Sequence, residues 1–213
     1  MNNNKQLLSV YVAKNPKNNK AIELFGDAYG YQKKWDEAIE QYKLLTLQQP
    51  DVANYFYKYG GALSQKAISV NKLRAISYLD DIETAFLQAL KLNPNHIESH
   101  WALARYYMHV PGLLGGSETK AMQHVEALLK ISPVDGYLAK GHYYEDEKEF
   151  EKSEIYYRKA IAIGGSQVCY QHLIDLFKLQ KQYKKAIVVL DEANEKLQLD
   201  DFVKQRKALE AKL

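Results

Sequence analysis

Six histidines and one cysteine offer this chain its widest range of chemistry. His96 and His100 are four residues apart, which would place two imidazoles on one face of a helix, as in some metal sites. The glutamate that zinc peptidases carry beside such a pair is absent, and the sequence offers no third ligand. We therefore predict no metal and no other cofactor. Cys169 has no second cysteine to pair with, and we expect a buried thiol.

The other four histidines have no nucleophile or acid at a spacing typical of catalysis. They are His109, His124, His142 and His172. Nothing else pairs a nucleophile with a base or forms a cofactor loop, so we predict that the chain is not an enzyme.

The segment from Pro111 to Ser117 has three glycines before a predicted helix, and such glycines could expose amide groups to an anion. It lacks the Gly-Lys-Ser/Thr ending of a nucleotide-binding loop. We interpret it as a shaped turn in which Ser117 caps the next helix.

Composition is that of a folded protein, with 46% hydrophobic and 26% charged residues. The net charge of +3 gives no indication of nucleic acid or of an anionic membrane as a partner. No window approaches the ~18 apolar residues of a spanning helix, so we expect no membrane insertion. The first five residues do not resemble a signal peptide. The compartment stays open between the cytoplasm, which is the default, and the periplasm, if a leader has been removed.

The elements that must position these residues are marked by prolines, which cannot continue a helix. Successive intervals between Pro16, Pro50, Pro94 and Pro133 are 34, 44 and 39 residues. Intervals of this size are typical of helical-repeat proteins, in which each repeat is one helix-turn-helix unit.

The residues between Pro16 and Pro50 carry the most informative pattern. One predicted helix places Phe25, Gly26 and Tyr29 on a single face, and the next helix does the same with Ala38, Tyr42 and Leu45. An apolar-Gly-x-x-Tyr element, then Ala-x-x-x-aromatic, then Pro, resembles the tetratricopeptide repeat. The Pro-Gly-x-x-Gly-Gly-Ser segment is similar to inserts in bacterial proteins of this kind, which implies a bacterial origin.

The resemblance implies an all-α fold: a right-handed α-solenoid of about five helix-turn-helix repeats in a single superhelical domain over 1–213. We expect a half-repeat at 1–18, repeats at 19–52, 53–96, 97–133, 134–166 and 167–199, and a capping helix at 200–213 that begins with Asp200 or Asp201 as its N-cap. Ten extra residues near 67–75 should lengthen both helices of the second repeat, because Leu73, Ile76 and Leu79 continue a helical face.

Such proteins are scaffolds or adaptors that hold a peptide or partner segment in a concave groove lined by the first helix of each repeat. Helical phase predicts the lining. It comprises Lys20, Glu23, Asp27 and Tyr31; Asn54, Tyr57, Gly61 and Gln65; Glu98, Trp101, Arg105 and His109; Leu138, His142 and Glu145; and Gln171, Asp175 and Lys178. The binding site that we select from these is Asp27, Tyr57, Glu98, Trp101, Arg105, His109 and His142. Trp101 could instead be buried against a neighbouring helix, and the sequence leaves both interpretations open.

The acids of the predicted groove limit its partners to proteins or peptides. One tetratricopeptide subclass binds the C-terminal carboxylate of chaperones through lysine and asparagine side chains. Here Glu23 and Asp27 stand at the first two of those positions, so we exclude that ligand and expect basic or amide groups in the partner. Acids in the groove also argue against RNA. The alternative function is a structural or assembly factor that self-associates into a homo-oligomer through the repeat face left open by the N-terminal half-repeat.

Overall fold

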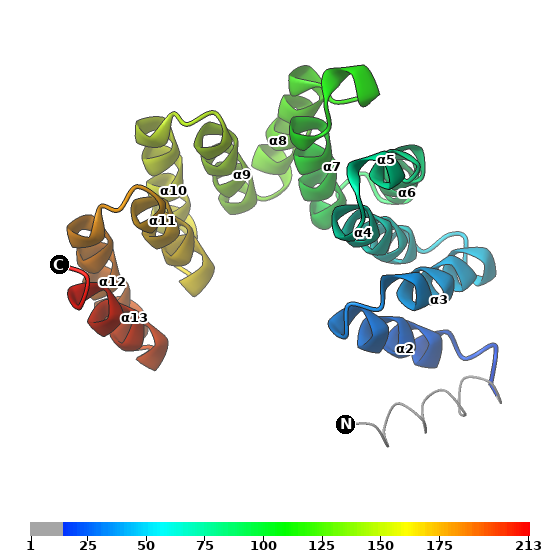
Figure 1. Ribbon diagram of the computed structural model, residues 1–213, viewed down its shortest axis with the longest axis horizontal. Helices are drawn as coiled ribbons and strands as arrows, with labels where there is room; N and C mark the ends of the chain where they lie inside the picture. Colours follow the sequence, from blue (N-terminus) through cyan, green and yellow to red (C-terminus); the bar gives the residue numbers. More distant parts are fainter. Residues whose placement is uncertain (1–14) are drawn as a thin grey trace. The chain divides into compact units, whose positions relative to one another are not determined.

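The computed structural model describes residues 15–213, and this part of the chain is helical without strands. Helices follow one another as five pairs (Figure 1). These are α2 (Asn19–Tyr31) and α3 (Trp35–Gln48); α4 (Ala53–Ser69) and α6 (Leu79–Leu92); α7 (Ile97–His109) and α8 (Glu118–Ile131); α9 (Pro133–Asp146) and α10 (Phe150–Gly164); and α11 (Gln167–Leu179) and α12 (Tyr183–Leu197). The predicted all-α class and number of repeats are confirmed. Residues 1–14, which hold most of the predicted half-repeat, lie outside the described part.

The chain forms two compact units, of which the first ends at Ala121 and the second is Met122–Leu213. The boundary falls inside α8, so we describe each unit by itself. A single domain over 1–213 stays a prediction.

Close contact between a glycine of the first helix and an aromatic ring of the second holds several pairs together. A Cβ placed on Gly26 would lie 2.7 Å from Cε1 of Tyr42, and one on Gly141 would lie 2.2 Å from Cε1 of Tyr157. Because glycine has no side chain, the tyrosine ring of the second helix packs directly on the backbone of the first, and the two helices approach closely.

Three of the hairpins turn through a lysine with a left-handed backbone. Lys33, Lys148 and Lys181 have φ angles of 56°, 61° and 58°. Each follows the first helix of its repeat by a few residues and precedes the second helix. The same local conformation therefore recurs at the same position of the repeat, although glycine would adopt it with less strain.

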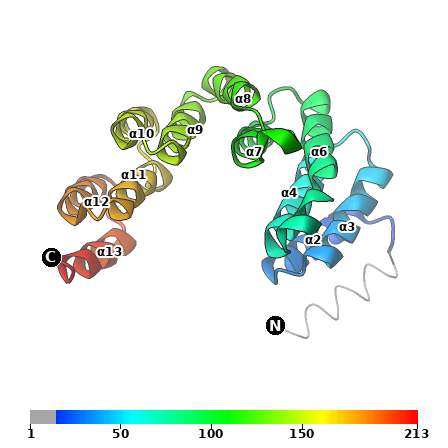
Figure 2. The ribbon, with the colours of Figure 1, turned by 45° about the horizontal axis from the view of Figure 1, so that its top comes forward.

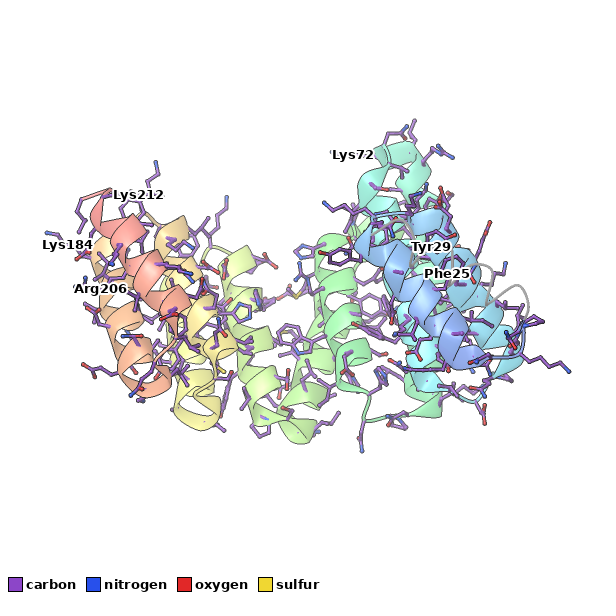
Figure 3. All side chains as sticks on the ribbon, turned by 90° about the horizontal axis from the view of Figure 1, so that it is seen from below. Phe25, Tyr29, Lys72, Lys184, Arg206 and Lys212 are labelled. Atoms are coloured by element: carbon purple, nitrogen blue, oxygen red, sulfur yellow. The ribbon has the colours of Figure 1, made fainter. Side chains whose placement is uncertain are left out.

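The ten extra residues of the second repeat lengthen its first helix, as predicted, but not its second, and they add a separate short helix between the two. Helix α4 ends at Ser69, α5 covers Lys72–Ile76 after two non-helical residues, and α6 begins at Leu79. Lys72 lies at the outer end of this insert (Figure 3). The predicted continuous apolar face is wrong, because Leu73 is 84% exposed and only Leu79 packs against the core. Three apolar residues at helical spacing therefore do not by themselves define one buried face.

The Pro111–Ser117 loop contains the 3-10 turn η1 (Gly112–Leu114) and connects α7 to α8 (Figure 2). Its amides are used internally: those of Leu114 and Gly116 donate to the Pro111 carbonyl and that of Gly115 to Gly112. Ser117 donates its amide to the carbonyl of Tyr107, and its hydroxyl accepts from the amide of Lys120. The loop is thus the capped turn that the sequence favoured, since these amides are not left for an anion.

Helix α13 (Asp200–Glu210) covers the last hairpin, as predicted. Phe202 is fully buried, and Arg206 on its outer side pairs with Asp191 of α12 at 2.6 Å (Figure 3). The residue at the N-cap is Leu199, which has no side chain able to accept the amide bonds, so the predicted cap by Asp200 or Asp201 is wrong. Both acids instead lie in the first turn, where a negative charge interacts favourably with the positive end of the helix dipole. No helix in the described part of the chain is long and apolar enough to cross a membrane.

Candidate functional site

A cavity of about 640 Å³ opens in the first unit between α4, α6 and α7. Its apolar lining comes from all three helices and includes Tyr57, Ile82, Phe86, Trp101 and Tyr106. A volume of this size, lined mainly by aromatic and aliphatic groups with a few polar ones, is typical of sites that bind small molecules or side chains.

Five of the seven residues selected from the sequence line this one cavity. They are Tyr57, Glu98, Trp101, Arg105 and His109, and Gly61 and Gln65 of the wider predicted lining join them. Trp101 is partly exposed, so of the two interpretations left open by the sequence, the structure places its ring at the cavity rather than fully inside the core. Their role in binding stays a prediction.

A second, smaller cavity of about 270 Å³ adjoins the first along α4. Both cavities are lined by Tyr57, Gly61 and Gln65, and the smaller one also by Trp35 and Lys58. Nothing lies within 4 Å of the position that a Cβ of Gly61 would occupy. The missing side chain at Gly61 therefore leaves the space between the two cavities open.

Several residues of the large cavity could not be chosen from helical phase. Ile82 and Phe86 belong to the second helix of their repeat, whereas the predicted lining came only from first helices. Ile68 and Val110 lie at the ends of α4 and α7, where the inserts begin. The one sequence signal near Ile68 and Val110 was the position of the two inserts, because the repeat pattern stops there.

Glu23 and Asp27 stand apart from both cavities in a network of ion pairs. Lys58 of α4 lies 2.8 Å from a carboxylate oxygen of Glu23 and 2.7 Å from one of Asp27. Asp27 also accepts a hydrogen bond of 2.6 Å from the Tyr42 hydroxyl, and Lys20 pairs with Glu23 at 3.2 Å. The expectation that Glu23 faces an open groove is wrong, because it is only 9% exposed.

The titration of this network follows from its contacts. Burial by itself would raise the pKa of Glu23, but hydrogen bonds from Lys58 and Lys20 outweigh it and hold the pKa below its ordinary value. Burial would likewise lower the pKa of Lys58, and its hydrogen bonds to Asp27 and Glu23 raise it instead. The lowered pKa favours the charged form of Glu23. Both Glu23 and Asp27 already have cationic partners in the same chain.

His142, the remaining selected residue, lies in the second unit and packs against other rings. Its ring centroid is 4.5 Å from that of His172 and 5.6 Å from that of Tyr157. The Tyr157 hydroxyl donates to Glu145 at 2.7 Å, and burial raises the pKa of that carboxyl. Leu138, also predicted to line the groove, is 5% exposed and belongs to the core. A shift of one position turns a side chain by ~100° around a helix, so phase alone misplaced it.

The spaced pair His96 and His100 has structural contacts. Nδ1 of His96 accepts the backbone amide of Ser99 at 3.2 Å and caps α7, while Nε2 of His100 lies 2.9 Å from the carbonyl of Pro94. Among the described residues, no three histidine, cysteine or acidic side chains form a group that could hold a metal ion.

Comparison with known proteins agrees with these hairpins. A profile described as tetratricopeptide repeat matches residues 134–163, which correspond to α9 and α10. The described part of the chain has the helical-repeat fold of the tetratricopeptide type. No curated protein matches its sequence.

Solved structures share the fold of this tetratricopeptide protein at low identity. One is a thermophilic tetratricopeptide protein of Thermus thermophilus, with 18% identity over 86% of this chain and 89% of that one and a TM-score of 0.65. Another, from Parabacteroides merdae, has 15% identity over 88% and 70% of the two chains and a TM-score of 0.61. Yeast Tom70 has 12% identity and a TM-score of 0.65; the match covers 98% of this chain and 43% of Tom70. Tetratricopeptide repeats generally mediate contacts between proteins and serve as scaffolds rather than enzymes.

Proposed function

We propose that the chain binds a segment of a partner protein in the cavity between α4, α6 and α7, and that it does so without chemistry on the bound protein. The observation that carries this proposal is the position of Tyr57 and Trp101, two partly exposed aromatic side chains that line the same cavity from neighbouring first helices. Aromatic side chains in such a position supply most of the affinity in many interfaces, because they bury a large area at a small cost in entropy.

The two cavities along α4 suit an extended segment better than a compact ligand. They share Tyr57, Gly61 and Gln65, so a chain that fills the larger cavity can continue past Gly61 into the smaller one. The apolar lining then holds its side chains, and the polar residues at the edge hold its backbone.

A selection from a phage-displayed library of random peptides tests the proposal, because it does not require the partner to be identified. The chain has only two tryptophans, and Trp35 and Trp101 line the two cavities. Binding of a selected peptide should therefore change the tryptophan emission, and the change gives the dissociation constant. Trp101→Ala should weaken binding by about thirtyfold, the loss of an aromatic anchor.

Gly61→Leu is the decisive variant. The Cβ of this leucine would have nothing within 4 Å, and leucine favours the helix more than glycine does. The variant should fold and fail to bind. Leu47→Ala, on an exposed position of α3, is the matched control and should bind as the wild type does. Selected peptides that bind Gly61→Leu and wild type equally well would place the binding site elsewhere.

A further inference from the structure

The charges beside the large cavity differ from those that the sequence indicates. Arg105 lines the cavity, is exposed, and makes no ion pair within residues 15–213. Lys58, by contrast, is committed to Glu23 and Asp27 at 2.7–2.8 Å. The acids that suggested a basic partner are therefore matched within the chain, and the guanidinium of Arg105 is left to a ligand.

Glu98 is the acidic residue of the cavity lining, and its position gives the site a direction. It lies three residues before Trp101, whereas Arg105 lies four residues after it, so the two charges lie about one helical turn to either side of the ring. Nδ1 of His96 lies 3.4 Å from the Glu98 carboxylate and accepts the backbone amide of Ser99. The acidic side chain of Glu98 disfavours a second acid at its own end of the cavity.

The spacing on α7 sets the spacing in the ligand. Side chains four residues apart on a helix are separated by about 6 Å along its axis. In an extended segment, every second side chain points to the same side, and two such side chains lie about 7 Å apart. An apolar side chain beside Trp101 therefore brings the side chain two residues along the segment next to Arg105.

We propose that the bound segment is extended and carries an acidic side chain two residues from its apolar anchor, with the apolar side chain against Trp101 and the carboxylate on Arg105. This inference rests on the proposed function and names the class of partner: a protein with an acidic, apolar motif. A guanidinium binds a carboxylate through two parallel hydrogen bonds, which gives the contact geometric as well as electrostatic selectivity.

The test is a charge exchange between protein and peptide. Random peptides displayed on phage are selected in parallel on the wild type, on Arg105→Glu and on Arg74→Glu, a matched control on the exposed helix α5. The wild type and Arg74→Glu should enrich an apolar residue followed or preceded at the second position by Asp or Glu. Arg105→Glu should enrich Lys or Arg at that position. A synthetic wild-type peptide should bind Arg105→Glu about tenfold more weakly, and replacing its acid by lysine should recover most of the loss.

The outcomes separate this inference from the proposed function. Enrichment of an apolar residue with no acid at a fixed spacing, or the same motif from Arg105→Glu as from Arg74→Glu, would overturn the acidic motif and leave the cavity as the binding site. Enrichment of an acid only next to the anchor would overturn the extended geometry. If the wild type selects no peptide that Gly61→Leu fails to select, the proposed function falls, and the motif falls with it.

Discussion

Two adjacent glycines of α4 allow the packing of the first unit to be tested by the same substitution in two environments. A Cβ on Gly60 would lie 2.9 Å from Cε1 of Phe86 and 3.2 Å from Cβ of Ala85, both in the buried face of α6. A Cβ on Gly61 would meet nothing within 4 Å. Gly60 thus faces the core and Gly61 faces the cavities.

The expected free energies follow from these distances. Alanine gains about 1 kcal/mol over glycine in the interior of a helix, and this gain applies to both positions. At Gly61 nothing opposes it, so Gly61→Ala should stabilise the first unit by about 1 kcal/mol. At Gly60 the ring of Phe86 must shift, which costs about 1–3 kcal/mol in a packed core. Because the helix term cancels, the difference between the two variants measures the packing cost alone.

Urea unfolding followed by tryptophan fluorescence is the suitable assay. Trp35 and Trp101 are the only tryptophans and both belong to the first unit, so the signal reports that unit without the second. Gly61→Ala should raise the midpoint, and Gly60→Ala should lie below it by the packing cost. Equal shifts in the same direction would show that Phe86 does not pack on Gly60, and the close approach of α4 to α6 would be refuted.

Three further variants test other contacts. Lys58→Met should destabilise the first unit by about 1–3 kcal/mol near neutral pH. The folded pKa of Glu23 is lowered, so the stability contributed by its ion pairs is present above the ordinary value of 4.5 and is lost as the pH falls through the folded pKa. The urea midpoints of variant and wild type should therefore converge in acid, and a constant gap at all pH values would contradict the pairing. Gly116→Ala would put a Cβ 1.6 Å from a backbone oxygen, so the loop must rearrange; limited proteolysis should cut it faster than the wild type, and unchanged cleavage would refute the tight turn. Tyr157→Phe removes the donor to half-buried Glu145 and should cost about 1–3 kcal/mol, measured by circular dichroism because the second unit has no tryptophan; a neutral result would deny that hydrogen bond a role in stability.

Much of the cavity lining could be predicted because it depends on local geometry. Side chains four residues apart lie on one helical face, so identifying the packing face of α7 also indicated that Trp101 and Arg105 share another face. The same reasoning failed for Leu138, where an error of one position exchanged the groove for the core. Helical phase gives the angular positions of side chains around a helix. Which of these side chains are buried depends on where the neighbouring helices lie.

The inserts mark a second limit. Leu73 and Ile76 continue an apolar period in the sequence, yet α5 leaves both side chains exposed. The glycines of the Pro111–Ser117 loop were consistent with either a turn or an anion site. The carbonyls that bind its amides come from within the loop and from Tyr107, and the sequence does not state these pairings.

The sequence by itself determined that this chain is a row of helical hairpins with small residues facing rings. A packing contact such as that between Gly26 and Tyr42 joins two helices that are adjacent in the chain. The spacing of such residues along the sequence therefore indicates the repeat directly. Tertiary structure alone decided how the acids of α2 are paired. Lys58 reaches Glu23 and Asp27 from another helix about thirty residues away, and this turns two apparent ligand-binding acids into internal ion pairs. Such a contact depends on how far a long side chain of one helix reaches toward another helix, and the spacing of residues along the sequence does not indicate this distance.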